Sequence, residues 1–169
     1  MLWITSDHHF GHTKIIEYCN RPFQDVDHMN QYMIDKWNSV VRPDDVVLHL
    51  GDFALQMDEE EVTHLVSKLH GDIILVRGNH DRFGVEKFKR CGFVDVKKKI
   101  NFKNFILTHK PLPVEDLDAG KINIHGHVHN SLTYHYSINH INVSVEMWDY
   151  TPIDFIQLCT KLKFPNLTP

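Results

Sequence analysis

Long apolar runs are absent from this chain of 169 residues, since none exceeds the four residues of 73–76. A membrane-spanning helix needs about 20 apolar residues, so the sequence predicts no span. No basic stretch precedes the first apolar residues, and we expect no secretory signal peptide. The hydrophobic share of 42% is nevertheless enough for a core, and no linker or repeat interrupts the chain. These features indicate one domain over residues 1–169 that ends in a short proline-containing tail.

Cysteine and net positive charge are also scarce. The three cysteines, Cys19, Cys91 and Cys159, are far apart and form no C-x-x-C pair, which argues against a disulfide or thiolate–metal framework and favours a reducing, cytoplasmic location. With 18 basic against 22 acidic residues the net charge is −4, so we expect no broad binding to duplex nucleic acid. The lysine run 97–99 is interpreted as protection of a strand edge. Oligomeric state is not predicted.

Short apolar runs rich in branched residues predict strands, and amphipathic stretches between them predict helices. We expect strands at 2–5, 46–50, 73–76, 105–108, 122–125 and 141–145, and helices at 27–41, 58–70, 85–90 and 152–162. Alternating strands and helices in the first half indicate βαβ units, and the strand-rich second half indicates another sheet packed on the first. The predicted fold class is α/β.

Histidine is abundant, with 14 residues in the chain, and many lie where the predicted strands end. Five strand ends carry polar blocks, which are Asp7-His8-His9, Gly51-Asp52, Gly78-Asn79-His80-Asp81, Thr108-His109 and His125-Gly126-His127-Val128-His129. Ligands of α/β proteins gather at the carboxyl ends of strands, so we expect these side chains at one rim. Oxygen and nitrogen donors without sulfur suit Mn²⁺, Fe or Zn²⁺. If extended backbone continues past the strands, residues two apart, such as Asp7 and His9, point to one side.

The order of these blocks, D-x-H, G-D, G-N-H-[DE], H and G-H-x-H, resembles the calcineurin-like metallophosphoesterases, and the segment 142–144 followed by Tyr150-Thr151-Pro152 resembles the closing part of that family. The opening residues 6–12 are similar to small bacterial and phage members. The resemblance implies a four-layer α-β-β-α sandwich, in which two mixed β-sheets lie face to face with helices outside.

The resemblance also implies a role for each block. It assigns Asp7, His9 and His129 to a first metal ion, Asn79, His109 and His127 to a second, and Asp52 as the carboxylate between them. It makes His80 the catalytic histidine. Two close ions can activate a bridging hydroxide for in-line attack on phosphorus, while His80 assists the leaving group. Asp81 is expected to orient the His80 ring.

Other residues near the blocks have less certain roles. His12 and Arg82 are expected to contact substrate, although Arg82, like Lys110 and Arg21, could equally be a solvated basic residue. His8 and His125 alternate away from the donors and are expected to pack in the interior.

The sequence therefore predicts a binuclear metal-dependent phosphoesterase with two divalent ions, Mn²⁺ being the best match. The substrate is a phosphomonoester or phosphodiester, either a small molecule or a nucleotide or nucleic-acid end. One alternative is a non-catalytic metal-binding scaffold for other proteins, and another is a nuclease acting on short single strands. The retention of all seven implied ligands and of His80 favours the enzyme over the scaffold.

Overall fold

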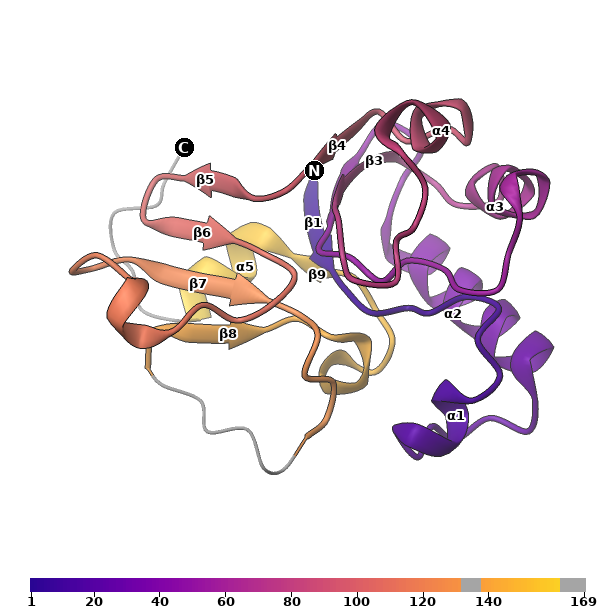
Figure 1. Cartoon of the computed structure of the whole chain (residues 1–169), viewed down its shortest axis with the longest axis horizontal. Helices are drawn as coiled ribbons and strands as arrows, with labels where there is room; N and C mark the ends of the chain where they lie inside the picture. Colours follow the sequence, from indigo (N-terminus) through magenta and orange to yellow (C-terminus); the bar gives the residue numbers. More distant parts are fainter. Residues whose placement is uncertain (132–137, 162–169) are drawn as a thin grey trace.

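Two β-sheets make up the centre of the protein (Figure 1). The computed structural model describes residues 1–131 and 138–161. The five-stranded sheet has the order β4-β3-β2-β1-β9, with bounds Asp95–Lys97, Asp72–Val76, Val46–His49, Leu2–Thr5 and Ile153–Asp154. The four-stranded sheet has the order β5-β6-β7-β8, with bounds Ile100–Phe102, Phe105–Leu107, Ile122–His125 and His140–Asn142. Both sheets are mixed, since β9 runs antiparallel to β1 and β5 antiparallel to β6. The predicted α/β class with two mixed sheets is confirmed.

Three helices cover the five-stranded sheet, namely α2 (Val26–Val40), α3 (Glu59–Val66) and α4 (Val85–Arg90). The Asp25 side chain caps α2, and Asp58 forms a capping box with Glu61 at the start of α3. The apolar stripe of α2 buries Met29, Met33 and Trp37 in one core with β1, β2 and β3. This core fixes the outer helical layer on the sheet.

A second core lies between the two sheets. Ile4 and Leu48 from the first sheet share it with Phe105 and Ile124 from the second. Helix α5 (Phe155–Lys161) closes this core, because the Phe155 ring lies 5.7 Å from that of Phe105. On the other face of the second sheet, the side-chain amide oxygen of Asn123 on β7 accepts a hydrogen bond from the backbone N–H of Leu112. The outermost layer there is a loop with one 3-10 turn, Val114–Asp116, in the described part of the chain.

Some predicted boundaries differ from the structure. The helix expected at 152–162 begins only at Phe155, because Ile153 pairs with Ile4 in β9 and the Asp154 side chain caps the helix by accepting from two backbone N–H groups. Residue 162 lies outside the described residues. The helix expected at 58–70 ends at Val66, where a tighter turn leads into Gly71. The short helix α1 (Ile15–Tyr18) and the strands β4, β5 and β9 were not predicted.

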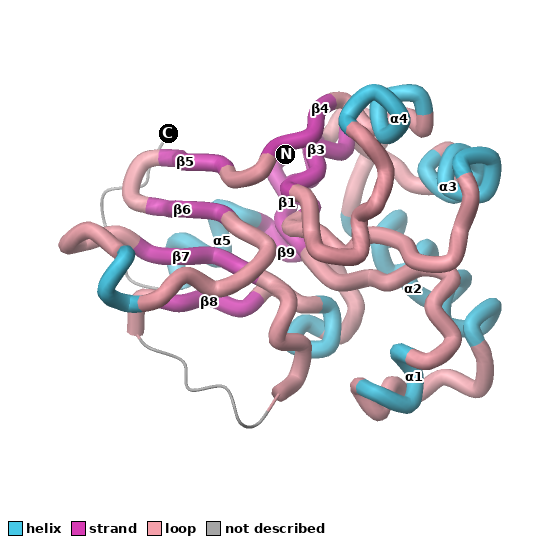
Figure 2. Tube along the Cα trace, viewed as in Figure 1, coloured by secondary structure: helices cyan, strands magenta, loops and turns pink. Residues whose placement is uncertain are grey.

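At one end of the molecule the two sheets meet. Ser6, which follows β1, forms a parallel bridge with Ser144, which follows β8, and the Val145 N–H donates to the Ser6 carbonyl oxygen. Figure 2 shows that the chain leaves the strands as loops here. The carboxyl ends of β1, β2 and β3 and those of β6, β7 and β8 are therefore neighbours. Among the described residues, no helix has the length and apolarity to cross a membrane.

Candidate metal centre

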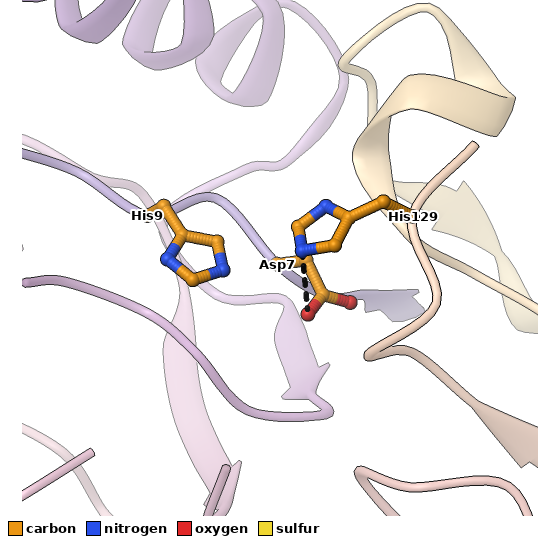
Figure 3. A group of neighbouring side chains, drawn as sticks. All are labelled: Asp7, His9 and His129. Atoms are coloured by element: carbon orange, nitrogen blue, oxygen red, sulfur yellow. Dashed lines mark ion pairs between the residues drawn. The ribbon is translucent and has the colours of Figure 1, made fainter. Parts of the chain in front are cut away.

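The first cluster of predicted ligands, called here the first donor group, consists of Asp7, His9 and His129. Asp7 and His9 follow β1, whereas His129 follows β7 in the other sheet. One ligand atom of each residue lies within 4.8 Å of the others, and Figure 3 shows the three side chains turned toward one another. The ion pair drawn there joins His129 Nε2 to Asp7 Oδ1 at 3.9 Å. The fold thus brings residues that are far apart in the sequence into one ligand cluster.

The second donor group consists of Asn79, His109 and His127, and it lies next to the first. His109 Nε2 is 2.9 Å from Asn79 Oδ1, and ligand atoms of His109, His127 and Asp52 all lie within 4.8 Å of one another. Asp52 faces both groups, because its Oδ2 is 3.3 Å from His109 Nε2 and 3.4 Å from His9 Nε2. All seven predicted ligands are therefore neighbours, with Asp52 between the two groups.

The backbone at these ligands is unusual, and it corrects the expectation of continued extended strand. Five of the seven have positive φ, a region that non-glycine residues seldom occupy; they are Asp7 (62°), His9 (54°), Asp52 (54°), His127 (72°) and His129 (48°). Left-handed residues, and not strand alternation, bring Asp7 and His9 to one side. Such backbone costs of the order of 1–3 kcal/mol per residue and persists where the surrounding structure enforces it, as functional sites do.

Close backbone approach explains two of the glycines at the site. A Cβ on Gly126 would lie 2.1 Å from Asp7 Oδ2, and one on Gly78 would lie 2.1 Å from Asp52 Oδ1. Side chains at either position would displace a carboxylate of the cluster. Gly126 therefore allows the loops of the two sheets to approach each other, and Gly78 allows the loops after β2 and β3 to do so.

The donor atoms fit divalent cations, because acceptors face one another. His109 Nδ1 lies 2.9 Å from the Leu50 carbonyl oxygen, which only accepts, so Nδ1 carries a proton and Nε2 is the nitrogen that faces Asn79 and Asp52. Asp7 Oδ1 and both ring nitrogens of His9 are buried without a hydrogen-bond partner in the described part of the chain. Unpaired buried polar atoms are costly, and a cation would satisfy the acceptors among them, namely Asp7 Oδ1 and one nitrogen of His9.

The ionisation of the cluster supports the same fit. Burial raises the pKa of Asp7, which means that the nearby imidazoles do not fully compensate its carboxylate. Burial also lowers the pKa of His9 to about 2, so this ring is neutral and one of its two nitrogens offers a lone pair. Burial opposes ionisation of Asp52, but the hydrogen bond and charge of His109 prevail and lower its pKa. The cluster offers two carboxylates, an amide oxygen and imidazole nitrogens, the donors expected of a Mn²⁺, Fe or Zn²⁺ site.

His80 stands at the edge of the cluster, half-buried, with its ring 5.2 Å from the His9 ring. Its backbone N–H donates to Asp52 Oδ1 at 2.8 Å. The expectation that Asp81 orients this ring is wrong, because His80 Nδ1 has no hydrogen-bond partner among residues 1–131 and 138–161. The buried Asp81 carboxylate instead accepts from the backbone N–H groups of Asp52, Phe53 and Gly78. Asp81 therefore joins the loops after β2 and β3.

Two cavities flank His80. The larger, of about 460 Å³, contains His12, Tyr18, residues of the first donor group and the loop 128–131. The His12 ring lies 5.4 Å from that of His9, with its Nδ1 unpartnered within the described residues. The smaller cavity, of about 200 Å³, is mainly apolar, with Met57 and Phe83 in its wall and Arg82 beside them. Arg82 and Lys110 are exposed, and no hydrogen bond fixes the Arg82 side chain within the described structure.

Buried residues around the first donor group were not predicted. Glu146 Oε1 accepts a hydrogen bond from His129 Nδ1 at 2.8 Å, and Ser144 Oγ donates to Asp7 Oδ2 at 2.9 Å. Arg21, which could have been a solvated basic residue, is instead buried and pairs with Glu146. The sequence signal was limited to the segment 142–144, since no spacing rule links Arg21 to Glu146. His8 packs in the interior as expected, with Nδ1 2.9 Å from His49 Nε2.

Comparison with known proteins identifies the family. The model for calcineurin-like phosphoesterases matches residues 1–162. The chain belongs to the calcineurin-like phosphoesterase family. An uncharacterized protein of Methanocaldococcus jannaschii, MJ1445, is 41% identical over 167 residues, which cover 95% of this chain and 90% of that protein. The Gene 66 protein of Mycobacterium phage L5 is 29% identical, with 86% of both chains covered.

Solved structures agree with the family assignment. A protein of unknown function from Aquifex aeolicus, AQ665, superposes with a TM-score of 0.74 and 27% identity over 95% of this chain and 98% of that one. The nuclease MPE of Pseudomonas putida has a TM-score of 0.51 and 18% identity over 76% of this chain and 61% of that one, which shows a shared fold alone. Members of the calcineurin-like phosphoesterase family are metal-dependent phosphoesterases, and the two donor groups described above are suited to divalent metal ions.

Proposed function

We propose that this calcineurin-like phosphoesterase hydrolyses a phosphodiester with two divalent metal ions, Mn²⁺ being the best match to the donors. Asp7, His9 and His129 would hold one ion, and Asn79, His109 and His127 the other, with Asp52 shared. When bound, two such ions supply an activated water and positive charge for the phosphoryl oxygens. The shared position of Asp52, within 3.4 Å of both groups, supports this assignment.

The observation that favours a diester over a monoester is the position of His80 between two cavities. A monoester has one organic substituent, whereas a diester has two, one for each side of a phosphate held at the ions. The cavity with Tyr18 and His12 can take one substituent. The apolar cavity with Met57 and Phe83 can take the other, and its volume of about 200 Å³ suits a single planar ring system. A nucleotide or the end of a short nucleic-acid strand has such a ring.

The protein's own residues then have distinct tasks. A ring nitrogen of His80 donates a proton to the leaving oxygen, since the ring borders both cavities. His12 contacts the substrate from the first cavity, and Arg82 pairs with a phosphate oxygen or a second anionic group at the rim of the other. Asp81 acts at a distance, by fixing the loops that present Asp52 and Asn79.

The test compares bis-p-nitrophenyl phosphate with p-nitrophenyl phosphate on the Mn²⁺-loaded protein. We expect the higher kcat/KM for the diester, and we expect Phe83→Ala to lower the diester-to-monoester ratio. Phe102→Ala, an exposed aromatic of β5, is the matched control and should leave the ratio unchanged. Because both esters are measured on the same sample, a loss of folded protein does not alter the ratio. A preference for the monoester would contradict the proposal.

The two alternatives predict other results. A non-catalytic scaffold would bind two ions and hydrolyse neither ester, nor cyclic nucleotides. A nuclease would favour short oligonucleotides over both small esters, so oligonucleotides complete the panel. The net charge of −4 and the exposed position of Arg82 allow a few contacts to a strand end but no broad duplex groove.

A further inference from the structure

Arg21 is a buried charge that the chemistry proposed above does not use. Its side chain is 0% exposed and that of its partner Glu146 is 3% exposed. Nη2 and Nε of Arg21 donate to Glu146 Oε1 at 2.7 and 2.9 Å. Burying two charges is expensive and is seldom justified by stability alone. The remaining contacts of the pair indicate what it does.

The guanidinium also holds the backbone that carries two candidate ligands. Nη2 of Arg21 donates to the Asp7 carbonyl oxygen and Nη1 to the His8 carbonyl oxygen, both at 2.7 Å. These carbonyls belong to the segment in which Asp7 and His9 adopt positive φ. A single planar guanidinium therefore fixes the conformation that brings the Asp7 and His9 side chains together.

Glu146 extends the same support to the third residue of the first donor group. Its Oε1 accepts the His129 Nδ1 proton at 2.8 Å, so Nε2 is the ring nitrogen that faces Asp7 and would bind an ion. Glu146 is itself anchored, because the neighbouring Val145 N–H donates to the Ser6 carbonyl oxygen across the two sheets. A carboxylate behind a ligand imidazole fixes its tautomer and increases its basicity.

The second donor group has a different support. His109 Nδ1 donates to the neutral Leu50 carbonyl. In the described part of the chain, the side chains of Arg21 and Glu146 contact each other and Asp7, His8, Met29, Met33, Tyr150 and His129, and no member of the second donor group. We infer that Arg21 and Glu146 are positioning residues for the ion of the first donor group and not for that of the second. This inference rests on the proposed two-ion function and specifies how one half of that site is held.

The experiment measures Mn²⁺ binding by calorimetry and by electron paramagnetic resonance in the wild type and in Glu146→Gln and Arg21→Lys. The first substitution keeps the size of the side chain, and the second keeps the charge. We expect one of the two affinities to fall about 10- to 100-fold, the usual cost of losing a ligand's hydrogen-bonded partner, and the other to stay within about twofold. Glu59→Gln, which removes the surface ion pair with Arg90, is the matched control and should change neither affinity.

Ligand variants identify the affected site. In a His129→Ala background the effect of Glu146→Gln should disappear, whereas in a His127→Ala background it should persist. An equal fall of both affinities would show a general structural role, and unchanged affinities would show no role; either result overturns the inference. If Glu146→Gln does not fold, Arg21→Lys decides between the same outcomes. Failure of the wild type to bind two ions would instead refute the proposed function.

Discussion

The two donor groups lie side by side, yet the protein builds them differently. Asp7 and His9 of the first group are buried, adopt left-handed backbone and rest on the charged pair Arg21–Glu146. In the second group Asn79 is exposed, His127 is half-buried and also left-handed, and the partner of the buried His109 is a neutral carbonyl. One half of the site is enclosed and supported by charge, and the other half is open and supported by the backbone.

This difference indicates how backbone strain and solvent access are distributed between the two donor groups. Enclosed left-handed residues need strong local contacts, and a buried guanidinium supplies several at once. The cavity with Arg82 and Phe83 is lined by His80, the neighbour of Asn79 in the open half, whereas the larger cavity is lined by His9 and His129 of the first group. Asp52 belongs to both halves. Substitutions of Asp52 and of residues in each half should therefore separate effects on both ions from effects on one ion.

The largest effect is expected from Asp52→Asn. Removal of the carboxylate that faces both groups should weaken both ions and lower hydrolysis of every ester by more than about 10⁴-fold, since each lost charge contact costs about 10² to 10³. Metal analysis of wild type and variant checks this expectation. Unchanged occupancy in Asp52→Asn would mean that the two halves do not share this residue.

The next effect is expected from His80→Ala, and it should depend on the leaving group. A proton donor matters for an alkoxide and hardly matters for p-nitrophenolate, so an alkyl or nucleoside diester should slow by about 10² to 10⁴ and a p-nitrophenyl diester much less. Both metals should remain bound. Steady-state kinetics at saturating Mn²⁺ provide the test, and equal losses on the two esters would leave His80 as a phosphate-binding cation.

A smaller effect is expected from Asp81→Asn, which tests the open half. The substitution replaces one carboxylate oxygen by an amide nitrogen, which cannot accept. Either the hydrogen bond from Phe53 N–H or those from Asp52 and Gly78 N–H are then lost, so the loops after β2 and β3 should loosen. We expect Mn²⁺ affinity to fall about 10- to 100-fold. Asp149→Asn, at an exposed surface ion pair, is the control. A normal affinity in Asp81→Asn would show that this half needs no such support.

The smallest effect concerns pH and the interior beneath the first donor group. Burial lowers the pKa of His49 to about 3, so the folded protein keeps this ring neutral, while the unfolded chain protonates it below about 6.5. Stability is therefore full above pH 6.5 and decreases as pH falls from there toward 3. Between pH 7.5 and 5.5 the ion-free protein should lose about 1 kcal/mol from this ring. Urea unfolding of wild type and His49→Gln tests the contribution, and identical pH profiles would contradict it.

Local patterns predicted much of the fold. The strands 2–5 and 122–125 and the helix 85–90 have the observed bounds, because their apolar runs are bounded by turn residues that act locally. The strand β9 has only two residues and forms because Ile153 pairs with β1, a tertiary contact that no local pattern contains. Because of the same pairing, the last helix begins at Phe155 and not, as predicted, at residue 152.

The candidate site likewise has a part that local patterns predicted and a part that depends on tertiary contacts. Donors arranged as motifs at strand ends could be predicted, since parallel strands in one sheet direct their carboxyl ends to one edge. The left-handed backbone of Asp7 and His9 could not be predicted, because it is supported by hydrogen bonds from Arg21 that only the folded chain forms. The contact of Glu146 with His129 could likewise not be predicted, because it forms only when β7 and β8 have placed Glu146 behind the His129 ring.

The bridge between Ser6 and Ser144 has a consequence for how the molecule holds together. The donor residues on either side of this bridge come from different sheets, with Asp7 in one and His129 in the other. An ion bound by both residues links the two sheets, so its binding free energy stabilises the contact between them. Release of that ion and separation of the sheets are then thermodynamically linked events.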